Sequence, residues 1–325
     1  MRLSTSRRLT ALFGAAAILV AACGGATTAP SSAPSQAAPS TAASEAPSQA
    51  PVATPVANVP EAQLVVATRL TVCSDIPYPP LEYFDDQGNP TGSDIDIATE
   101  IANRLGLKVA IENTVFDTII AALQGGKCDI IVSDQNITTD RVKQVDMIPY
   151  FQAGQAFVVA KGNPAGLKTT DDLCGKKIAA ETGTTEVDYL DGTGDYKGGK
   201  GLNDACKTKG LPAIQTTPFE KDSDAALALQ AGQVDAYFAD FPVAANYANT
   251  KPDIFELSPI PQLAPALAGI SVQNTGHAEL EKAVQTALVS MINDGTYLSI
   301  LQRYKDEAGA ITADIANQVN KTTLP

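Results

Sequence analysis

The chain has 325 residues, a formal net charge of −13 at pH 7, and aromatic residues at 6% of its positions with no tryptophan. Nucleic-acid binding is excluded, because binding a phosphate backbone needs a basic surface and this chain is strongly acidic. The apolar fraction of 44% excludes a wholly disordered chain, and the length is sufficient for more than one folded lobe.

The N-terminus is predicted to be an export signal followed by a lipid-attachment site. Basic residues within 1–8 precede an apolar run over residues 9–22, which is too short to span a bilayer but suits a secretory signal peptide. The run ends in VAACGG, which resembles the bacterial lipobox, where the cysteine is acylated and becomes the mature N-terminus. We therefore expect residues 1–22 to be removed and Cys23 to carry lipid; ordinary signal-peptidase cleavage before the cysteine is the alternative.

Residues 23–62 are predicted to form a disordered tether between the lipid and the folded protein. The segment consists mainly of Ala, Pro, Ser and Thr, so it cannot bury enough surface to offset the entropy of ordering. Two acyl chains make membrane attachment stable where one does not. We therefore expect a lipid-anchored protein on the extracytoplasmic face of the bacterial cell membrane, with its folded part beginning near Leu64.

The first folded segment has the pattern of a β-α-β-α-β unit. The predicted elements are a strand at 64–73, a helix at 94–105 ended by Gly106, a strand at 108–111, a helix at 117–124 and a strand at 129–132. Strands that alternate with helices in this way are typical of a parallel sheet covered by helices.

A similar helix-glycine-strand segment recurs 106 positions later. The sequence DTIIAALQGGKCDIIVSD of residues 117–134 aligns without gaps on SDAALALQAGQVDAYFAD of residues 223–240. Part of this likeness is common to all such units, but we interpret it as structural equivalence of two lobes. Asp134 and Asp240 would then lie just beyond the carboxyl ends of corresponding strands, which is where open α/β sheets bind ligands.

The remaining elements predict a second lobe and two crossings between the lobes. They are strands at 157–160, 176–180 and 255–257, crossings at 151–154 and 262–269, and helices at 279–291 and 296–308. Lobe 1 would comprise residues 63–153 and 266–325, and lobe 2 residues 154–265. Two lobes joined in this way suggest hinge closure on a small ligand.

Four cysteines remain once Cys23 is assigned to lipid, and an even number in an exported chain predicts two disulfides. Three pairings are possible. We favour Cys73–Cys128 and Cys174–Cys206, because each pair then lies within one lobe. The chain has no CxxC spacing and a single histidine, so we expect no metal site.

Three separated stretches resemble the polar amino-acid branch of the bacterial extracellular solute-binding proteins, which are receptors of ABC importers. They are SDIPYPPLEY at 74–83, GSDIDI at 92–97 and ITTDR at 137–141. The likeness extends over about residues 64–309. It implies a type II periplasmic-binding-protein fold, with two α/β lobes and two hinge crossings, that closes on a free amino acid without enzymatic activity or a cofactor.

The resemblance also implies roles for single residues. Arg141 matches the arginine that binds the ligand's carboxylate, and Asp240 matches the aspartate that binds its ammonium group, as suits a bidentate guanidinium and an anion. Tyr78 and Phe116 match aromatic positions that enclose the ligand's side chain. The alternatives are a solvent-facing Arg141, a turn role for Asp240, and core or rim positions for the two aromatic residues.

Further residues are predicted to border the same site, and several are acidic. They are Asp75, Ser133, Asp134, Asn136, Glu181 and Thr185. Burying Asp75, Asp134 and Glu181 together with Asp240 is costly unless a cation neutralises them. This favours arginine, lysine or ornithine as the ligand. If Asp134 and Glu181 point to solvent instead, glutamine or another polar amino acid becomes the expected ligand.

Residues 194–200 read GDYKGGK, which matches the first seven positions of a P-loop. Gly201 replaces the hydroxyl residue that should follow, and no buried strand precedes the segment. We interpret it as a mobile insert near Cys206.

The sequence favours a binding protein over two other functions. An exported lyase or dehydratase on the same fold would use Glu181 or Asp134 as a general acid, and a sensory binding module would need no permease. We expect a monomer that delivers its amino acid to an ABC permease.

Overall fold

The structure is a computed structural model that describes residues 54–324. The predicted signal peptide, the predicted acylated Cys23 and most of the predicted tether lie outside these residues. No helix between residues 54 and 324 is long and apolar enough to cross a bilayer.

Residues 54–62 were predicted to belong to the tether, but the structure places Val56, Ala57 and Val59 against lobe 1, just before Gln63. The Val56 amide donates to the carbonyl of Arg104 at 2.9 Å, and Gln63 Oε1 accepts from the amide of Leu280 at 2.8 Å. Ala57 and Val59 pack against the core. The proline-rich composition hid these apolar contacts, which depend on residues far along the chain.

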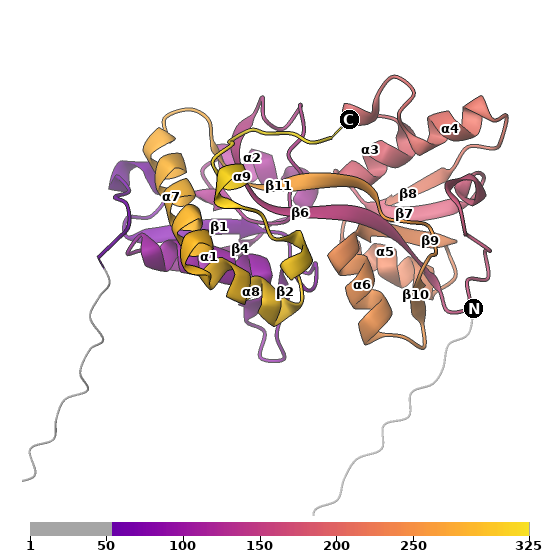
Figure 1. The fold of residues 1–325 in the computed structure, drawn as a ribbon, viewed down its shortest axis with the longest axis horizontal. Helices are drawn as coiled ribbons and strands as arrows, with labels where there is room; N and C mark the ends of the chain where they lie inside the picture. The colour runs from indigo at the N-terminus through magenta and orange to yellow at the C-terminus, as the bar shows by residue number, and fades with distance from the viewer. Residues whose placement is uncertain (1–53, 325) are drawn as a thin grey trace, which may run out of the picture. The chain divides into compact units, whose positions relative to one another are not determined.

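Within the described residues, one nine-stranded sheet runs through both lobes (Figure 1). Its order is β4-β1-β5-β11-β6-β9-β7-β8, and β10 pairs with β6. The strands are β1 Arg69–Ser74, β4 Lys108–Asn113, β5 Ile130–Ile131, β6 Val145–Ala160, β7 Lys177–Glu181, β8 Gln215–Phe219, β9 Ala236–Asp240, β10 Phe255–Leu257 and β11 Leu263–Gln273, while β2 Tyr83–Phe84 and β3 Pro90–Thr91 form a separate pair.

Helices cover the sheet in each lobe, as Figure 1 shows. Around β1 and β4 lie α1 Ser93–Arg104, α2 Ile119–Gln124, α7 Ala278–Asp294, α8 Thr296–Tyr304 and α9 Ala313–Ala316. Around β7 to β9 lie α3 Thr185–Asp191, α4 Leu202–Thr208, α5 Asp222–Gln230 and α6 Phe241–Thr250. Short 3-10 turns occupy Glu61–Gln63, Phe116–Thr118, Thr170–Leu173, Gly194–Tyr196 and Glu307–Gly309.

Two long antiparallel strands, β6 and β11, join the lobes (Figure 1). They pair from Val145 with Gln273 at one end to Gln155 with Leu263 at the other, and the register is irregular on both sides of the segment 266–268. The predicted fold of two α/β lobes with two crossings is therefore confirmed.

Most predicted elements of the first lobe form where expected, but the first strand is shorter than predicted. It begins at Arg69, because Thr68 has a φ of 64° and the amide of Val65 donates to Asp129 Oδ1 at 2.6 Å. The consecutive apolar residues at 64–66 predicted strand pairing, but the amide of Val65 bonds to the side chain of Asp129 instead. The predicted helix over 94–105 corresponds to α1.

Both predicted disulfides are present. Cys73 pairs with Cys128 and Cys174 with Cys206, each with Cα atoms 5.7 Å apart. The first joins β1 to the segment before β5 in lobe 1, and the second joins α4 to the neighbouring loop in lobe 2. Each disulfide lies within one lobe, which was the reason for favouring this pairing. The predicted pairing is confirmed.

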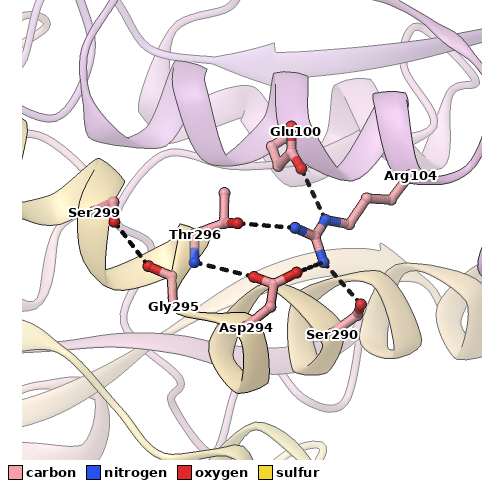
Figure 2. A network of polar contacts seen from close by, with 7 residues as sticks. All are labelled: Glu100, Arg104, Ser290, Asp294, Gly295, Thr296 and Ser299. Atoms are coloured by element: carbon pink, nitrogen blue, oxygen red, sulfur yellow. Dashed lines mark hydrogen bonds and ion pairs between the residues drawn. The ribbon is translucent and has the colours of Figure 1, made fainter. Parts of the chain in front are cut away.

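A polar network fastens the C-terminal helices to α1 (Figure 2). The guanidinium of Arg104 contacts Glu100 at 2.8 Å, Ser290 at 2.7 Å, Asp294 at 2.8 Å and Thr296 at 3.0 Å. Hydrogen bonding from Arg104 lowers the pKa of Asp294 to about 2. The Arg104 side chain is only 13% exposed, whereas its partners Asp294 and Glu100 are 49% and 28% exposed, so the guanidinium is shielded from water and the carboxylates are partly hydrated.

Arg104→Ala is expected to lower the free energy of unfolding by about 2 kcal/mol, because several charge-assisted hydrogen bonds are lost from a mostly buried site. Denaturant unfolding of the two proteins measures the change. Arg303→Ala is the matched control, since Arg303 is 61% exposed and pairs only with the carboxylate of Asp96 among the described residues. A loss for Arg104→Ala no larger than the control's would contradict the proposed importance of the network.

Candidate ligand-binding site

A cavity of about 310 Å³, its mouth included, lies where the two lobes meet. All ten residues predicted to border a ligand site surround it: Asp75, Tyr78, Phe116, Ser133, Asp134, Asn136, Arg141, Glu181, Thr185 and Asp240. Glu82, Thr184 and Glu186 border it as well and were not predicted. The structure thus gathers residues from distant parts of the sequence around one space.

The strand order explains why these residues meet. In lobe 1, Asp75 follows β1 and Asp134 follows β5, and the two strands are parallel. In lobe 2, Glu181 ends β7 and Asp240 ends β9, which are also parallel. Carboxyl ends of parallel strands lie at the same edge of a sheet, which is the ligand-binding edge of open α/β folds. Asp134 and Asp240, singled out by the internal repeat, border the same cavity.

The backbone of Asp134 is strained and is hydrogen-bonded to neighbouring residues of lobe 1. Its φ is 36°, a conformation that is costly for a residue with a side chain. Its amide donates to Asp94 Oδ2 and to Tyr150 Oη, both at 2.9 Å, and Tyr150 donates to the same Asp94 oxygen at 2.6 Å. These buried hydrogen bonds stabilise the strained backbone at Asp134.

Hydrogen bonds between the lobes close the walls of the cavity. Tyr78 of lobe 1 donates its hydroxyl to Asp240 Oδ2 at 3.0 Å and accepts from the Asp240 amide at 3.1 Å. Asn136 Nδ2 donates to Thr185 Oγ1 across the same boundary at 3.1 Å. The geometry described here is therefore that of closed lobes.

Arg141 is hydrogen-bonded at the boundary between the lobes, and some of its guanidinium N–H groups are not used in these contacts. Its Nη1 donates to the carbonyl of Asn136 at 2.7 Å, and its Nη2 donates to the carbonyl of Gly183 in lobe 2 at 2.9 Å. The guanidinium carbon lies 5.3 Å from the centre of the Phe116 ring, within range of a cation–π contact. Remaining N–H groups of the guanidinium can bind a carboxylate.

Acidic side chains from both lobes line the cavity. Asp75 of lobe 1 and Glu181 of lobe 2 affect each other's pKa, as do Glu186 and Asp240 of lobe 2. Glu82 accepts from Ser133 Oγ at 2.7 Å.

Burial raises the pKa values of these acids. It raises the pKa of Glu181 to about 11, with repulsion from Asp222 and Asp75 adding to the effect. Burial raises the pKa of Asp240 to about 6, although hydrogen bonds from Tyr78 and Asn136 and the charge of Arg141 oppose the shift. The pKa values of Glu82, Asp134 and Glu186 are likewise raised well above the ordinary range, first by burial and then by repulsion from neighbouring carboxylates.

Three carboxyl oxygens at the cavity lack hydrogen-bond donors among residues 54–324. They are Glu82 Oε2, Asp134 Oδ2 and Glu186 Oε1. All three residues are at most 5% exposed. A buried acceptor without a donor is costly, so the arrangement is suited to a group that supplies several N–H donors and positive charge.

The raised pKa values predict that the protein without ligand becomes less stable as pH rises from 5.5 to 8. Glu181 and Asp240 have ordinary pKa values of 4.5 and 3.8, so the folded state holds more protons than the unfolded state across this range. The free energy of unfolding should then fall by about 1 kcal/mol or more per pH unit. Urea unfolding at several pH values measures the slope.

Glu181→Gln should make this slope smaller, because glutamine holds no titrating proton. A stability that rises with pH over the same interval would show that the cavity acids are ionised in the folded protein.

Of the three unpredicted residues, two carry acids that affect the charge of the cavity. Glu82 lies within the stretch SDIPYPPLEY, and Glu186 directly follows Thr185 at the start of α3. Proximity to predicted site residues was the signal that could have identified them. Asp134 and Glu181 are 5% and 6% exposed, so neither faces solvent as the alternative interpretation required.

Comparison with known proteins gives consistent matches. The sequence profile of the bacterial extracellular solute-binding proteins, family 3, matches residues 70–307. The chain is 29% identical over 230 residues to the ABC transporter arginine-binding protein 1 of Escherichia coli, covering 70% of this chain and 86% of that protein.

Solved structures of amino-acid-binding proteins are also similar to this chain. An ancestral arginine-binding protein bound to arginine is 35% identical with a TM-score of 0.64, over 73% of this chain and 98% of that chain. An ancestral amino acid-binding protein described as a precursor of cyclohexadienyl dehydratase is 33% identical with a TM-score of 0.62, over 73% of this chain and 95% of that chain.

Proposed function

Because this chain belongs to the bacterial extracellular solute-binding proteins of family 3, we propose that it binds a cationic amino acid between its lobes and delivers it to an ABC importer. One observation carries the proposal. Among the described residues, six carboxyl side chains and a single cationic side chain, Arg141, line one interlobe cavity.

In this proposal the α-carboxylate and the α-ammonium group of the ligand each bind a side chain of opposite charge. Arg141 binds the α-carboxylate through the guanidinium N–H groups that Asn136 and Gly183 leave free. Asp240 binds the α-ammonium group, with Glu186 beside it. These contacts come from both lobes, so the ligand would stabilise the closed arrangement.

The side chain of the ligand is proposed to be cationic because the remaining acids outnumber the available cations. Glu181 keeps a proton because burial raises its pKa to about 11, and the cation would replace that proton. Glu82 and Asp134 supply acceptor oxygens that have no donor within the described residues. Arginine, lysine and ornithine fit this pattern. The arginine-binding relatives support the same class of ligand.

Delivery to a permease and attachment to the membrane complete the proposed function. The lipobox-like sequence at Cys23 and the Ala/Pro/Ser/Thr-rich segment after it support a lipid anchor with a long tether. The folded part would thus remain near the membrane while it captures its ligand.

Thermal unfolding of the mature chain carrying Cys23→Ser, screened against the common amino acids and ornithine, tests the proposed function. Bound ligand is first removed by unfolding and refolding with the disulfides intact. A ligand at about 100 times its Kd adds about 2.7 kcal/mol to the free energy of unfolding, which raises Tm measurably. Stabilisation by arginine, lysine or ornithine is expected. No shift with any amino acid would contradict the proposal.

An enzymatic function is the alternative, and one observation favours it. Glu181 retains its proton at neutral pH, as a general acid must, and one structural relative is described as a precursor of a dehydratase. Mass spectrometry of a stabilising amino acid after prolonged incubation with the protein separates the two functions. Recovery of the intact amino acid supports binding alone, and loss of water or ammonia supports a lyase.

Asp134→Ala is expected to weaken arginine binding about tenfold at pH 8 while weakening glutamine binding less than about threefold, because only a cation gains from the carboxylate. Isothermal titration calorimetry measures both affinities. Asp140→Ala is the control, since it removes an exposed acid of lobe 1 that pairs with Lys143. Equal losses for arginine and glutamine would remove Asp134 from the charge selection.

A further inference from the structure

In the segment of residues 192–201, between α3 and α4, Tyr196 and Gly201 are buried, whereas residues 197–200 are exposed. Tyr196 is 1% exposed and stacks on Tyr189 with ring centres 4.5 Å apart. A Cβ atom on Gly201 would lie 2.3 Å from the Cα of Gly192, so the close approach of the two backbones requires glycine at 201. We predicted a mobile insert here, and the packing of Tyr196 provides a fixed platform instead.

Asp195, on this platform, contacts the other lobe. Its Oδ2 accepts from the amide of Thr139 at 2.9 Å, and its Oδ1 accepts from the hydroxyl of the same threonine. Thr139 follows β5 and belongs to lobe 1, whereas Asp195 belongs to lobe 2. Both carboxylate oxygens are therefore used in one contact between the lobes.

The turn that Asp195 contacts is the turn that carries Arg141. The amide of Arg141 donates to Thr138 Oγ1 at 3.1 Å, and its guanidinium then reaches back to the carbonyl of Asn136. Asp195 does not border the cavity itself. It can thus influence the ligand through the position of this turn, through the closure of the lobes and through its charge near Arg141.

We propose that Asp195 is a positioning residue that latches the closed lobes together and slows release of the ligand. This inference rests on the proposed function, because release presupposes a bound amino acid. The Tyr78, Asn136 and Arg141 contacts close the wall of the cavity, and the Asp195 contact closes the boundary outside it. Breaking the latch lowers the barrier to opening without removing any contact to the ligand.

The test measures release of radiolabelled L-arginine after addition of excess unlabelled arginine. Asp195→Ala is expected to release arginine about tenfold faster, because two hydrogen bonds to a charged acceptor are lost. Asp195→Asn keeps one acceptor oxygen, so its release rate should lie between those of Asp195→Ala and the unmodified protein. Association rates should remain within about twofold, since opening rather than encounter is changed.

Asp140→Ala is the matched control, because it removes a charge beside Thr139 from a carboxylate that pairs with Lys143 of the same lobe. Its release rate should stay within about twofold of the unmodified protein. Tm values without ligand that agree among all four proteins would show that the fold is intact. Release from Asp195→Ala at the unmodified rate would overturn the inference.

A second readout does not depend on arginine being the ligand. The hydrogen-exchange rate of the Thr139 amide, measured with and without L-arginine, should be higher in Asp195→Ala than in the unmodified protein, since that amide loses its acceptor. If the Thr139 amide exchanges at the same rate in Asp195→Ala and in the unmodified protein, both with and without L-arginine, the proposed latch is overturned. If no amino acid stabilises the unmodified protein, the proposed function fails, and the exchange rates alone decide whether the latch exists.

Discussion

Arg141→Ala is expected to abolish measurable binding of every amino acid, with affinity reduced by a factor of about 1,000 or more. Removing a guanidinium from a bound carboxylate leaves a charge without a partner in a water-poor cavity, which costs several kcal/mol. The substitution also removes the hydrogen bond to the carbonyl of Gly183 that joins the lobes. Isothermal titration calorimetry with arginine, lysine and glutamine measures the loss.

Lys143→Ala is the control for this prediction. Lys143 lies two residues after Arg141, and its positively charged side chain is 70% exposed. Its affinities should stay within about twofold of the unmodified values. Arg141→Lys should recover only part of the binding, since an ammonium group cannot make the bidentate contact. Binding retained by Arg141→Ala would remove Arg141 from the site.

Asp240→Asn is expected to weaken every α-amino acid about a hundredfold, because the ammonium group loses its ion pair while the shape of the cavity is kept. The Tyr78 hydroxyl can still donate to the amide oxygen of the asparagine. The expected loss is therefore electrostatic and independent of the ligand's side chain.

A ligand without an α-ammonium group gives the sharpest control for Asp240. The des-amino analogue of arginine should bind the unmodified protein and Asp240→Asn with similar affinity. Asp235→Asn, just before β9, should leave arginine binding unchanged, because Asp235 instead accepts from the amide of Lys177. An equal loss of affinity for arginine and its des-amino analogue would show that Asp240 does not bind the ammonium group.

The charge of the cavity links ligand binding to protons. Burial raises the pKa of Glu181 to about 11, so this carboxyl group keeps its proton at neutral pH, and a cation that enters would displace it. The protein should therefore bind a cationic amino acid more tightly as pH rises, while its own stability without ligand falls. These opposite trends follow from the same buried acids.

Local sequence patterns predicted much of the fold, because helices and strands such as α1 and β4 depend on nearby residues. The cysteine pairing followed from assigning each cysteine to a lobe. The docking of residues 54–62 on lobe 1 was missed, since it depends on contacts such as that of Val56 with α1, which composition cannot show.

The candidate site was predictable to the extent that motifs mark it. Ten residues border one cavity as predicted, and their roles remain predictions. Glu82 and Glu186 were missed because their significance arises only when two lobes bring carboxylates together. Asp195 was missed because a glycine-rich segment gives no sign of the packing of Tyr196 or of its distance from Thr139.

The affinity of arginine relative to citrulline tests the central claim most directly, because citrulline has nearly the same shape but a neutral ureido group. Calorimetry at pH 8 compares the two ligands on the unmodified protein. The six carboxyl side chains around the cavity predict that arginine binds at least about a hundredfold more tightly. Equal affinities would contradict selection of a cationic side chain and favour a general receptor for polar amino acids.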